Sequence, residues 1–125
     1  MAGGRRPLVA FSPHFLSPTG LTVEFRPIVR RILDERYLRR DPEGQVIETP
    51  EELFWRVAKA VAAAEARYGG EKTAISRAED FHDAMATLKF LPNTPTLMNA
   101  GFPQGQLAAC FVIPIEDSME SIFTA

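Results

Sequence analysis

Apolar residues recur with a helical period in the first part of the chain. Between residues 23 and 40 they fall on one face of a helix, and charged residues lie mostly opposite. The apolar positions of this face are Ile28, Val29, Ile32, Leu33 and Tyr37. Pro27 suits the first turn of such a helix, where its missing N–H has no helical partner. The sequence DPEGQ at 41–45 predicts a turn after the helix.

A second helix is predicted from Thr49, which can cap it, with Pro50 at its first helical position. Glu52 completes a capping box with Thr49. The apolar stripe of this helix consists of Leu53, Phe54, Val57, Val61 and Ala64. The pair Gly69–Gly70 is expected to end it.

A third helix is predicted over about 74–88. Its inward positions would be Ile75, Phe81, Ala84, Met85 and Leu88. It should end before the following prolines, because Pro92 and Pro95 cannot continue a helix. Large side chains expected in the core, with no chemistry assigned, are Phe54, Trp55, Phe81 and Met85.

Residues 91–114 have a different pattern, a loop rich in Pro, Gly and Asn followed by a short apolar run. The run QLAACFVIP at 106–114 contains Cys110 and predicts a buried strand. A further helix should follow, with Asp117 as N-cap and Glu120 three residues on. A single strand has no partner for its backbone groups, so we expect the chain to be the front of a longer protein or one half of a split one.

Composition and charge exclude several classes. The formal charge of −2 argues against a nucleic-acid binder that neutralises phosphates. No metal site is predicted, because the chain has one cysteine and its two histidines are too far apart in sequence to match a metal-binding motif. These histidines are His14 and His82. No run reaches the ~18–20 apolar residues that cross a bilayer, so no membrane partner is expected. Residues 1–22 are expected to form an irregular arm, because they are rich in proline and glycine. The prolines interrupt their short apolar stretch, which argues against a signal peptide and predicts a cytoplasmic protein.

Three groups of residues are candidates for function, and each also has a plainer explanation. Cys110 can be a small buried thiol, or a redox thiol that needs a partner thiol from elsewhere. Thr94, Thr96 and Asn99 can hold turns, or can contact a phosphate or sugar. Asp117–Ser118 can cap a helix, or can receive the hydroxyl or phosphate groups of a nucleotide.

The most specific feature is the run LPNTPTLMNAGFPQGQLAACFVIPIEDSMESIF at 91–123. It resembles the start of the catalytic barrel of ribonucleotide reductases, most closely in the class II, adenosylcobalamin-dependent branch. The segment 32–65, ILDERYLRRDPEGQVIETPEELFWRVAKAVAAAE, resembles the helical region before that barrel. The resemblance covers about 24–125 and implies an α+β fragment that is mainly α. A helical domain would occupy 23–90, and 91–125 would hold the first strand and the helix start of a ten-stranded α/β barrel.

The resemblance also implies roles for single residues. Cys110 matches the first of two cysteines that reduce the substrate ribose and become a disulfide. Thr94 matches a residue that contacts the substrate phosphate. Ala109 matches a residue that touches the substrate. Some relatives have Ser at this position, and the contact of its side-chain hydroxyl would be missing here. The start of the site for a deoxynucleoside triphosphate effector is matched by Asp117, Ser118 and Met119.

In that family a thiyl radical on another cysteine starts the removal of the ribose 2′-hydroxyl group, and the radical is generated with the cofactor adenosylcobalamin. Of the three cysteines that this chemistry needs, only one is present here. The others, and most cobalamin contacts, are expected outside this sequence. The implied partners are a ribonucleoside di- or triphosphate, the effector, a thioredoxin-type reductant, the remainder of the reductase and a second copy of the protein.

Taken alone, the chain is predicted to be an inactive N-terminal portion of the reductase. One alternative is a subunit of a split reductase, which completes its barrel with a second polypeptide. Another is a non-catalytic helical module that binds nucleotides or a partner protein. A third, within the same chemistry, is the large subunit of the diiron-dependent class I enzyme.

Overall fold

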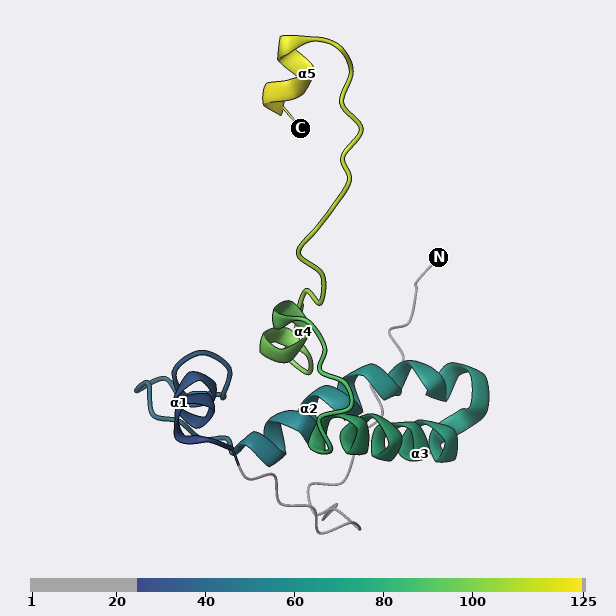
Figure 1. Cartoon of the computed structure of the whole chain (residues 1–125). Helices are drawn as coiled ribbons and strands as arrows, with labels where there is room; N and C mark the ends of the chain where they lie inside the picture. Colours follow the sequence, from purple (N-terminus) through teal and green to yellow (C-terminus); the bar gives the residue numbers. More distant parts are fainter. Residues whose placement is uncertain (1–24, 125) are drawn as a thin grey trace.

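The computed structural model describes residues 25–124, and its regular structure in that range is helical. The predicted arm at 1–22 lies outside the described residues. Figure 1 shows a helical body from which the last part of the chain extends. The elements are α1 (Pro27–Arg36), α2 (Pro50–Ala62), the short 3-10 helix η1 (Ala63–Glu65), α3 (Ala66–Ala86), α4 (Thr94–Asn99) and α5 (Met119–Thr124).

Helix α1 begins with Pro27 in its first turn, as predicted. Its predicted apolar face is only partly covered by the rest of the described chain. Leu33 and Tyr37 pack against the core, whereas Ile28 and Ile32 remain 58% and 43% exposed. The helix therefore forms as expected, and half of its apolar face is left without a described partner.

Helix α2 confirms the predicted capping box. The Thr49 hydroxyl accepts a hydrogen bond from the Glu52 N–H at 3.2 Å, and the Glu52 carboxylate accepts one from the Thr49 N–H at 2.7 Å. The first part of the predicted stripe is buried, namely Leu53, Phe54 and Val57. Farther along, Val61 is exposed. The stripe is thus correct where α2 faces the core.

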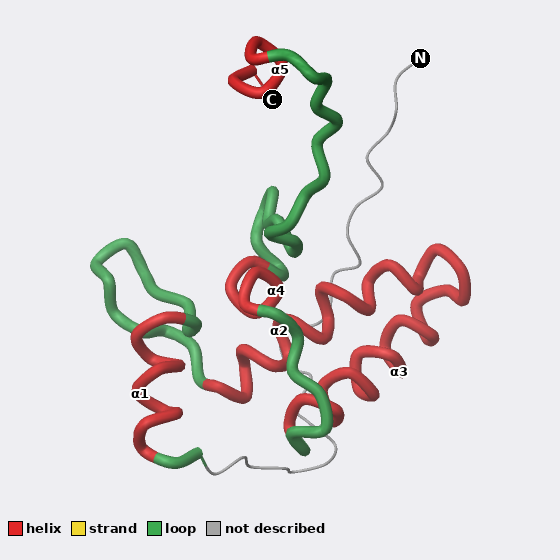
Figure 2. The backbone as a smooth tube through the Cα atoms, turned by 45° about the horizontal axis from the view of Figure 1, so that its top comes forward, coloured by secondary structure: helices red, strands yellow, loops and turns green. Residues whose placement is uncertain are grey.

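Helix α2 and the longer part of α3 lie side by side, because the chain reverses direction within the beginning of α3 (Figure 2). The reversal is at Gly70, whose φ of 77° and ψ of −178° interrupt the helical backbone. Glycine is required there because a side chain makes this conformation costly. The predicted break at Gly69–Gly70 is therefore confirmed, although the helical residues before it belong to α3.

The expectation that Leu88 points inward is wrong. Helix α3 ends at Ala86, and Leu88 has a φ of +57° and is 58% exposed. The N–H groups of Lys89 and Phe90 both bond to the Ala84 carbonyl, which closes the helix with a tight turn. This turn carries the chain away from the helical face before Leu88 can reach the core.

The main core lies between α2, the end of α3 and the segments that flank them. Its buried members are Leu38, Leu53, Phe54, Val57, Ala58, Met85, Ala86 and Ala100. Phe81 packs against them and is half-buried. Phe25 meets Phe54 edge to face, with ring centroids 6.2 Å apart. The core role predicted for the large side chains of α2 and α3 is confirmed.

A smaller cluster joins α2 to α3 through an aromatic stack that was not predicted. The rings of Trp55 and His82 lie 4.0 Å apart and are nearly parallel. His82 is fully buried, and its Nε2 and Nδ1 atoms lie 2.8 and 3.1 Å from carboxylate oxygens of Glu51 and Asp83. Beside this stack, burial lowers the pKa of Lys59. The polar atoms of the imidazole are thereby satisfied inside the helical pair.

The predicted strand at 106–114 is absent from the described residues. The segment has no regular hydrogen-bonded structure, and the chain from Gln106 onward leaves the helical body (Figure 1). A strand exists only when a neighbouring strand pairs with it, and the described residues contain no second strand. The mainly helical class is confirmed, while the start of a barrel stays a prediction. None of the described helices is both long and apolar enough to cross a membrane.

Candidate functional site

The predicted site residues lie in the segment from Thr94 to Met119, which begins with the short helix α4 where the sequence predicted a loop. Asn93 caps α4, because its side-chain oxygen accepts the Thr96 N–H at 3.3 Å and lies 2.6 Å from the Thr96 hydroxyl. That hydroxyl also lies 3.1 Å from the Leu107 carbonyl. The Asn99 amide donates to the Gln106 carbonyl at 2.8 Å. The turn-holding explanation therefore describes Thr96 and Asn99.

Thr94 differs from Thr96 in what its hydroxyl contacts. It is the first residue of α4 and is exposed. Its Oγ1 atom lies 3.2 Å from the hydroxyl oxygen of Tyr37, which directly follows α1. This contact joins two segments that are 57 residues apart in the sequence.

Arg56 of α2 fixes the position of α4. Its guanidinium bonds to Glu48 through Nε at 2.7 Å and through Nη2 at 3.0 Å. The same group donates to the carbonyls of Ala100 at 2.7 Å and Leu97 at 3.3 Å. Sequence reasoning missed this residue, although a lone arginine among the apolar positions of α2 was a usable signal. Arg56 thus ties the end of α4 to the body.

The turn after α4 is shaped by its fit against Arg56. The guanidinium lies over the Phe102 ring, 4.9 Å from its centroid. Gly101 has a φ of +85°, and a Cβ atom there would come within 2.9 Å of the Arg56 Cγ. A side chain at Gly101 would therefore be strained and would crowd Arg56. This turn directs the chain toward Ala109 and Cys110.

Ala109 and Cys110 lie exposed in the extended segment, and Cys110 is a free thiol. The plainer explanation for Cys110, a small buried thiol, does not describe its place here. Neighbouring apolar side chains are also uncovered, with Phe111 62% and Val112 100% exposed. The thiol is therefore accessible along a stretch whose backbone pairs with no strand among the described residues.

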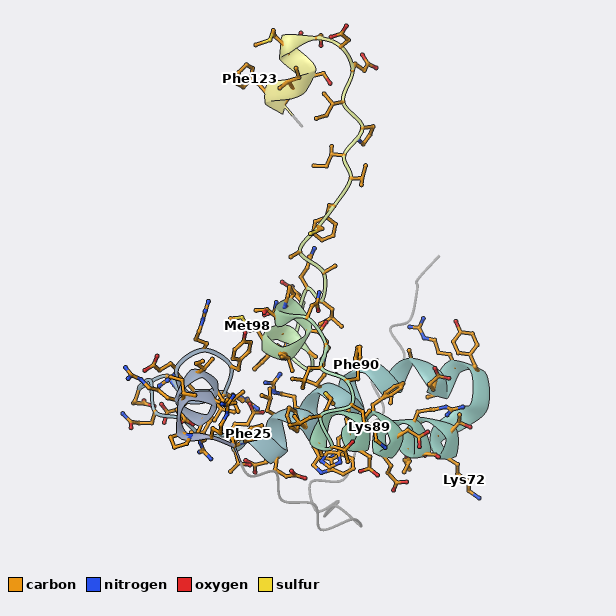
Figure 3. The ribbon with its side chains drawn as sticks, viewed as in Figure 1. Phe25, Lys72, Lys89, Phe90, Met98 and Phe123 are labelled. Carbon is orange, nitrogen blue, oxygen red and sulfur yellow. The ribbon has the colours of Figure 1, made fainter. Side chains whose placement is uncertain are left out.

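Asp117, Ser118 and Met119 lie at the start of α5, where Asp117 is not the N-cap. The helix begins at Met119, and the Ser118 hydroxyl accepts the Ser121 N–H at 3.1 Å. Ser118 caps because it stands three residues before that donor. The end of the chain, marked by Phe123 in Figure 3, lies away from α4. The structure does not bring these residues together with Thr94.

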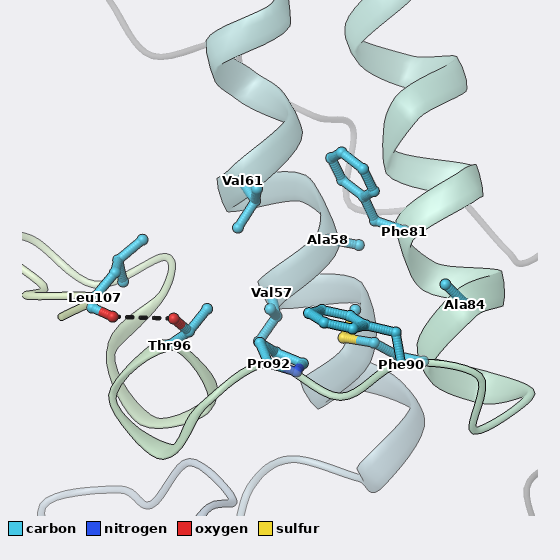
Figure 4. Close-up of a pocket in the computed structure, with 10 residues that line it drawn as sticks. Val57, Ala58, Val61, Phe81, Ala84, Phe90, Pro92, Thr96 and Leu107 are labelled. Carbon is cyan, nitrogen blue, oxygen red and sulfur yellow. Dashed lines mark hydrogen bonds between the residues drawn. The ribbon is translucent and has the colours of Figure 1, made fainter.

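An apolar groove of about 390 Å³ lies beside α4, between α2 and α3 (Figure 4). Thr96 is its one polar lining residue, and its hydroxyl is already close to the Leu107 carbonyl. The corrin of adenosylcobalamin carries many amide side chains that need hydrogen-bond partners. The groove lacks such partners and does not fit that cofactor. The described residues also contain no group of three or more His, Cys, Asp or Glu side chains that could hold a metal ion.

Known proteins similar to this chain are reductases. Residues 23–105 match the family model described as "Ribonucleotide reductase, all-alpha domain". The vitamin B12-dependent ribonucleoside-diphosphate reductase of Mycobacterium tuberculosis (strain CDC 1551 / Oshkosh) is 52% identical over 93 residues. That match covers 74% of this chain and 13% of the relative.

Two further relatives are more distant. The vitamin B12-dependent ribonucleoside-diphosphate reductase of Thermoplasma acidophilum is 32% identical, over 74% of this chain and 19% of the relative. The ribonucleoside-diphosphate reductase subunit alpha of Chlamydia trachomatis serovar D is 34% identical, over 73% and 8%. The chain thus spans less than a fifth of the length of each of these relatives. The match to the family model nevertheless covers most of the chain, which therefore belongs to the ribonucleotide reductase family.

Proposed function

We propose that this chain is the N-terminal portion of a class II reductase, which converts ribonucleotides to deoxyribonucleotides with adenosylcobalamin. The observation that carries the proposal is the 52% identity to a reductase that is itself named vitamin B12-dependent. The same relative is named for ribonucleoside diphosphates, which favours a diphosphate as substrate. Residues 23–90 would be the helical domain, and 91–125 would begin the barrel.

In this proposal Cys110 is one of the two thiols that reduce the ribose. Replacing the 2′-hydroxyl group by hydrogen releases water and consumes two electrons and two protons. Two thiols supply all four and are left as one disulfide. A thioredoxin-type dithiol then restores them by thiol–disulfide exchange. The exposed, free thiol of Cys110 supports this role, because a second thiol and the substrate can both approach it.

The proposed substrate contacts are Thr94 and Ala109. The exposed hydroxyl of Thr94 is suited to donate a hydrogen bond to a phosphate oxygen. Ala109 directly precedes the thiol and has no polar side-chain atom, so its polar contact with substrate would come from the backbone.

The proposed effector site begins at Asp117, Ser118 and Met119, which are all exposed. The Asp117 carboxylate would accept a hydrogen bond from a sugar hydroxyl group, because its charge repels phosphate. The effector would then select which ribonucleotide is reduced. The rest of this site, like the second redox cysteine, would be supplied by the remainder of the reductase in an assembly of two copies in the cytoplasm.

Adenosylcobalamin, when bound, supplies the radical chemistry that starts the reaction. Because the apolar groove does not fit a corrin, we assign its contacts to the remainder of the polypeptide. This chain would contribute the reducing thiol, the substrate contacts and the first strand of the barrel. The extended backbone at 108–114, which follows the bonded carbonyls of Gln106 and Leu107, supports that last role, since no strand among the described residues pairs with it.

The test is the substitution Cys110→Ser in the reductase that contains this chain. We expect it to abolish repeated turnover with a dithiol reductant, because serine cannot form the disulfide. Ala108→Ser, an equally small change in the same segment, is the control and should leave turnover intact. Mass spectrometry after one turnover without reductant should find Cys110 in a disulfide. Normal turnover of the Cys110→Ser enzyme would overturn the proposal.

The same preparation separates the class II assignment from class I. Turnover should require added adenosylcobalamin and no second, metal-containing subunit. Turnover without cobalamin would assign the chain to the class I large subunit instead. If activity needed a separately encoded barrel polypeptide, the chain would be a subunit of a split reductase. Nucleotide binding without any turnover would indicate a non-catalytic module.

A further inference from the structure

The contact between Tyr37 and Thr94 links the proposed substrate site to the end of α1. Tyr37 follows α1, and its N–H bonds to the Leu33 carbonyl at 3.0 Å. Its ring packs against the main core and is partly buried. The hydroxyl therefore stands at the tip of a side chain that is held at both its backbone and its ring. It lies 3.2 Å from the Thr94 Oγ1 atom.

We propose that Tyr37 is a positioning residue for the substrate phosphate, which acts by orienting the hydroxyl of Thr94. The proposal rests on the proposed role of Thr94. Two hydroxyl groups carry two protons, and the bond between them uses one. When Tyr37 donates, both the position of Thr94 Oγ1 and the direction of its remaining proton are restricted. That proton is then free for an anionic oxygen on the exposed side of α4.

The neighbouring threonine shows why this pair is distinctive. The hydroxyl of Thr96 lies beside the side-chain oxygen of Asn93 and the carbonyl of Leu107. Both are pure acceptors, so they take up its single proton. Tyr37 can instead donate to Thr94, which leaves the threonine proton available. A phosphate accepts hydrogen bonds and therefore needs a donor of this kind.

The rest of α4 is held independently of Tyr37. Arg56 binds the carbonyls of Leu97 and Ala100 at the other end of the helix. Removing the Tyr37 hydroxyl alone should therefore leave α4 in place and change only the freedom of the Thr94 side chain. Phenylalanine keeps the ring that packs on the core, so Tyr37→Phe isolates the hydroxyl.

The experiment measures kcat and KM for a ribonucleoside diphosphate in the complete, cobalamin-loaded reductase that contains this chain. The variants are Tyr37→Phe, Thr94→Val and the double variant, with Tyr68→Phe as control because Tyr68 is 87% exposed. We expect Tyr37→Phe to raise KM about 3- to 10-fold, the effect of one ordinary hydrogen bond, and to leave kcat within about twofold. Tyr68→Phe should change neither.

The double variant distinguishes positioning from a separate contact. If Tyr37 acts through Thr94, Tyr37→Phe should add nothing to the KM of Thr94→Val. Full additivity of the two effects would overturn the proposal, as would an unchanged KM in Tyr37→Phe. An unchanged KM in Thr94→Val would instead overturn the proposed substrate contact of Thr94. A fall in kcat and melting temperature without a change in KM would mean that the hydroxyl is only structural.

Discussion

At the scale of single residues, Arg56 and Glu48 form an ion pair almost entirely removed from water. Their side chains are 11% and 6% exposed. Such a pair is costly to desolvate, so it is favourable only when its remaining polar atoms are bonded. Here the Arg39 N–H donates to Glu48, and two carbonyls accept from Arg56. The pair therefore holds three segments of the chain in one arrangement.

Breaking this pair should destabilise the protein strongly. Arg56→Met would leave the Glu48 carboxylate buried without its cation and should lower the free energy of unfolding by about 3–5 kcal/mol. Arg56→Lys keeps the charge but loses the two-pronged geometry, so its loss should be smaller. Urea denaturation followed by circular dichroism measures both.

The control for this prediction is Arg77→Met on α3. Arg77 pairs with Asp80 at 3.0 Å, but both side chains are more than half exposed. Exposed pairs contribute little, so the urea midpoint should not move measurably. If Arg56→Met and Arg77→Met lowered the free energy of unfolding equally, burial would not make the Arg56 pair more stabilising than an exposed pair.

Two other residue contacts could not be predicted from the sequence. Tyr37 was expected on the apolar face of the first helix, which is correct for its ring, but its hydroxyl meets Thr94. His82 was noted only as unsuited to a metal site, yet it is buried in a stack with Trp55. Neither partner is a sequence neighbour, so helical periodicity carried no information about them.

At the scale of elements, α2 shows how much a few neighbouring residues decide. Thr49, Pro50 and Glu52 specify where it begins, and both hydrogen bonds of the capping box form. These interactions involve residues at most three positions apart, which is why the sequence predicted them. The break at Gly70 was predictable for the same reason, since its backbone conformation favours glycine.

The capping box yields a second stability prediction. Thr49→Ala removes the acceptor for the Glu52 N–H and should lower the free energy of unfolding by about 1 kcal/mol. For a domain of this size that corresponds to a fall of roughly 4–8 °C in melting temperature. Thr49→Ser keeps the hydroxyl and should lose clearly less in a thermal scan. Equal losses in the two variants would contradict a capping role for the hydroxyl.

The segment at 106–114 marks the limit of element prediction. Its apolar, partly β-branched composition suits a buried strand, and the structure leaves it extended and exposed. A helix closes its hydrogen bonds within itself, but a strand needs a second strand. The same difference explains why α5 forms a short helix immediately after an unpaired stretch.

At the scale of the whole molecule, the described chain consists of a packed helical body and an exposed C-terminal segment. The last hydrogen bonds described between that segment and the body are those of the Gln106 and Leu107 carbonyls. Large apolar side chains beyond them are exposed, among them Phe111, Ile113 and Phe123. The remainder of the proposed reductase would cover this surface.

Truncation tests this division. A chain ending at Ala108 keeps the contacts of Gln106 and Leu107, so its melting temperature should stay within about 2 °C of the full chain, less than about 0.5 kcal/mol. Its solubility should rise, because the exposed apolar side chains are gone. A chain ending at Asn99 also loses the Ala100 carbonyl that binds Arg56 and should melt earlier. A large loss on truncation at Ala108 would show that the segment stabilises the body.

The sequence by itself determined the three longer helices α1, α2 and α3, the capping box of α2 and the apolar positions of α2 that face the core, because these depend on residues one or two turns apart. The motif at 91–123 also predicted the family to which the chain belongs. The match of residues 23–105 to the all-alpha domain confirms that family. Only the tertiary structure decided that Arg56 reaches Glu48 and Ala100, and that Tyr37 meets Thr94. Those contacts join residues far apart in the chain, so they depend on how the helices pack. The extended state of 106–114 was likewise decided by the absence of a pairing strand among the described residues.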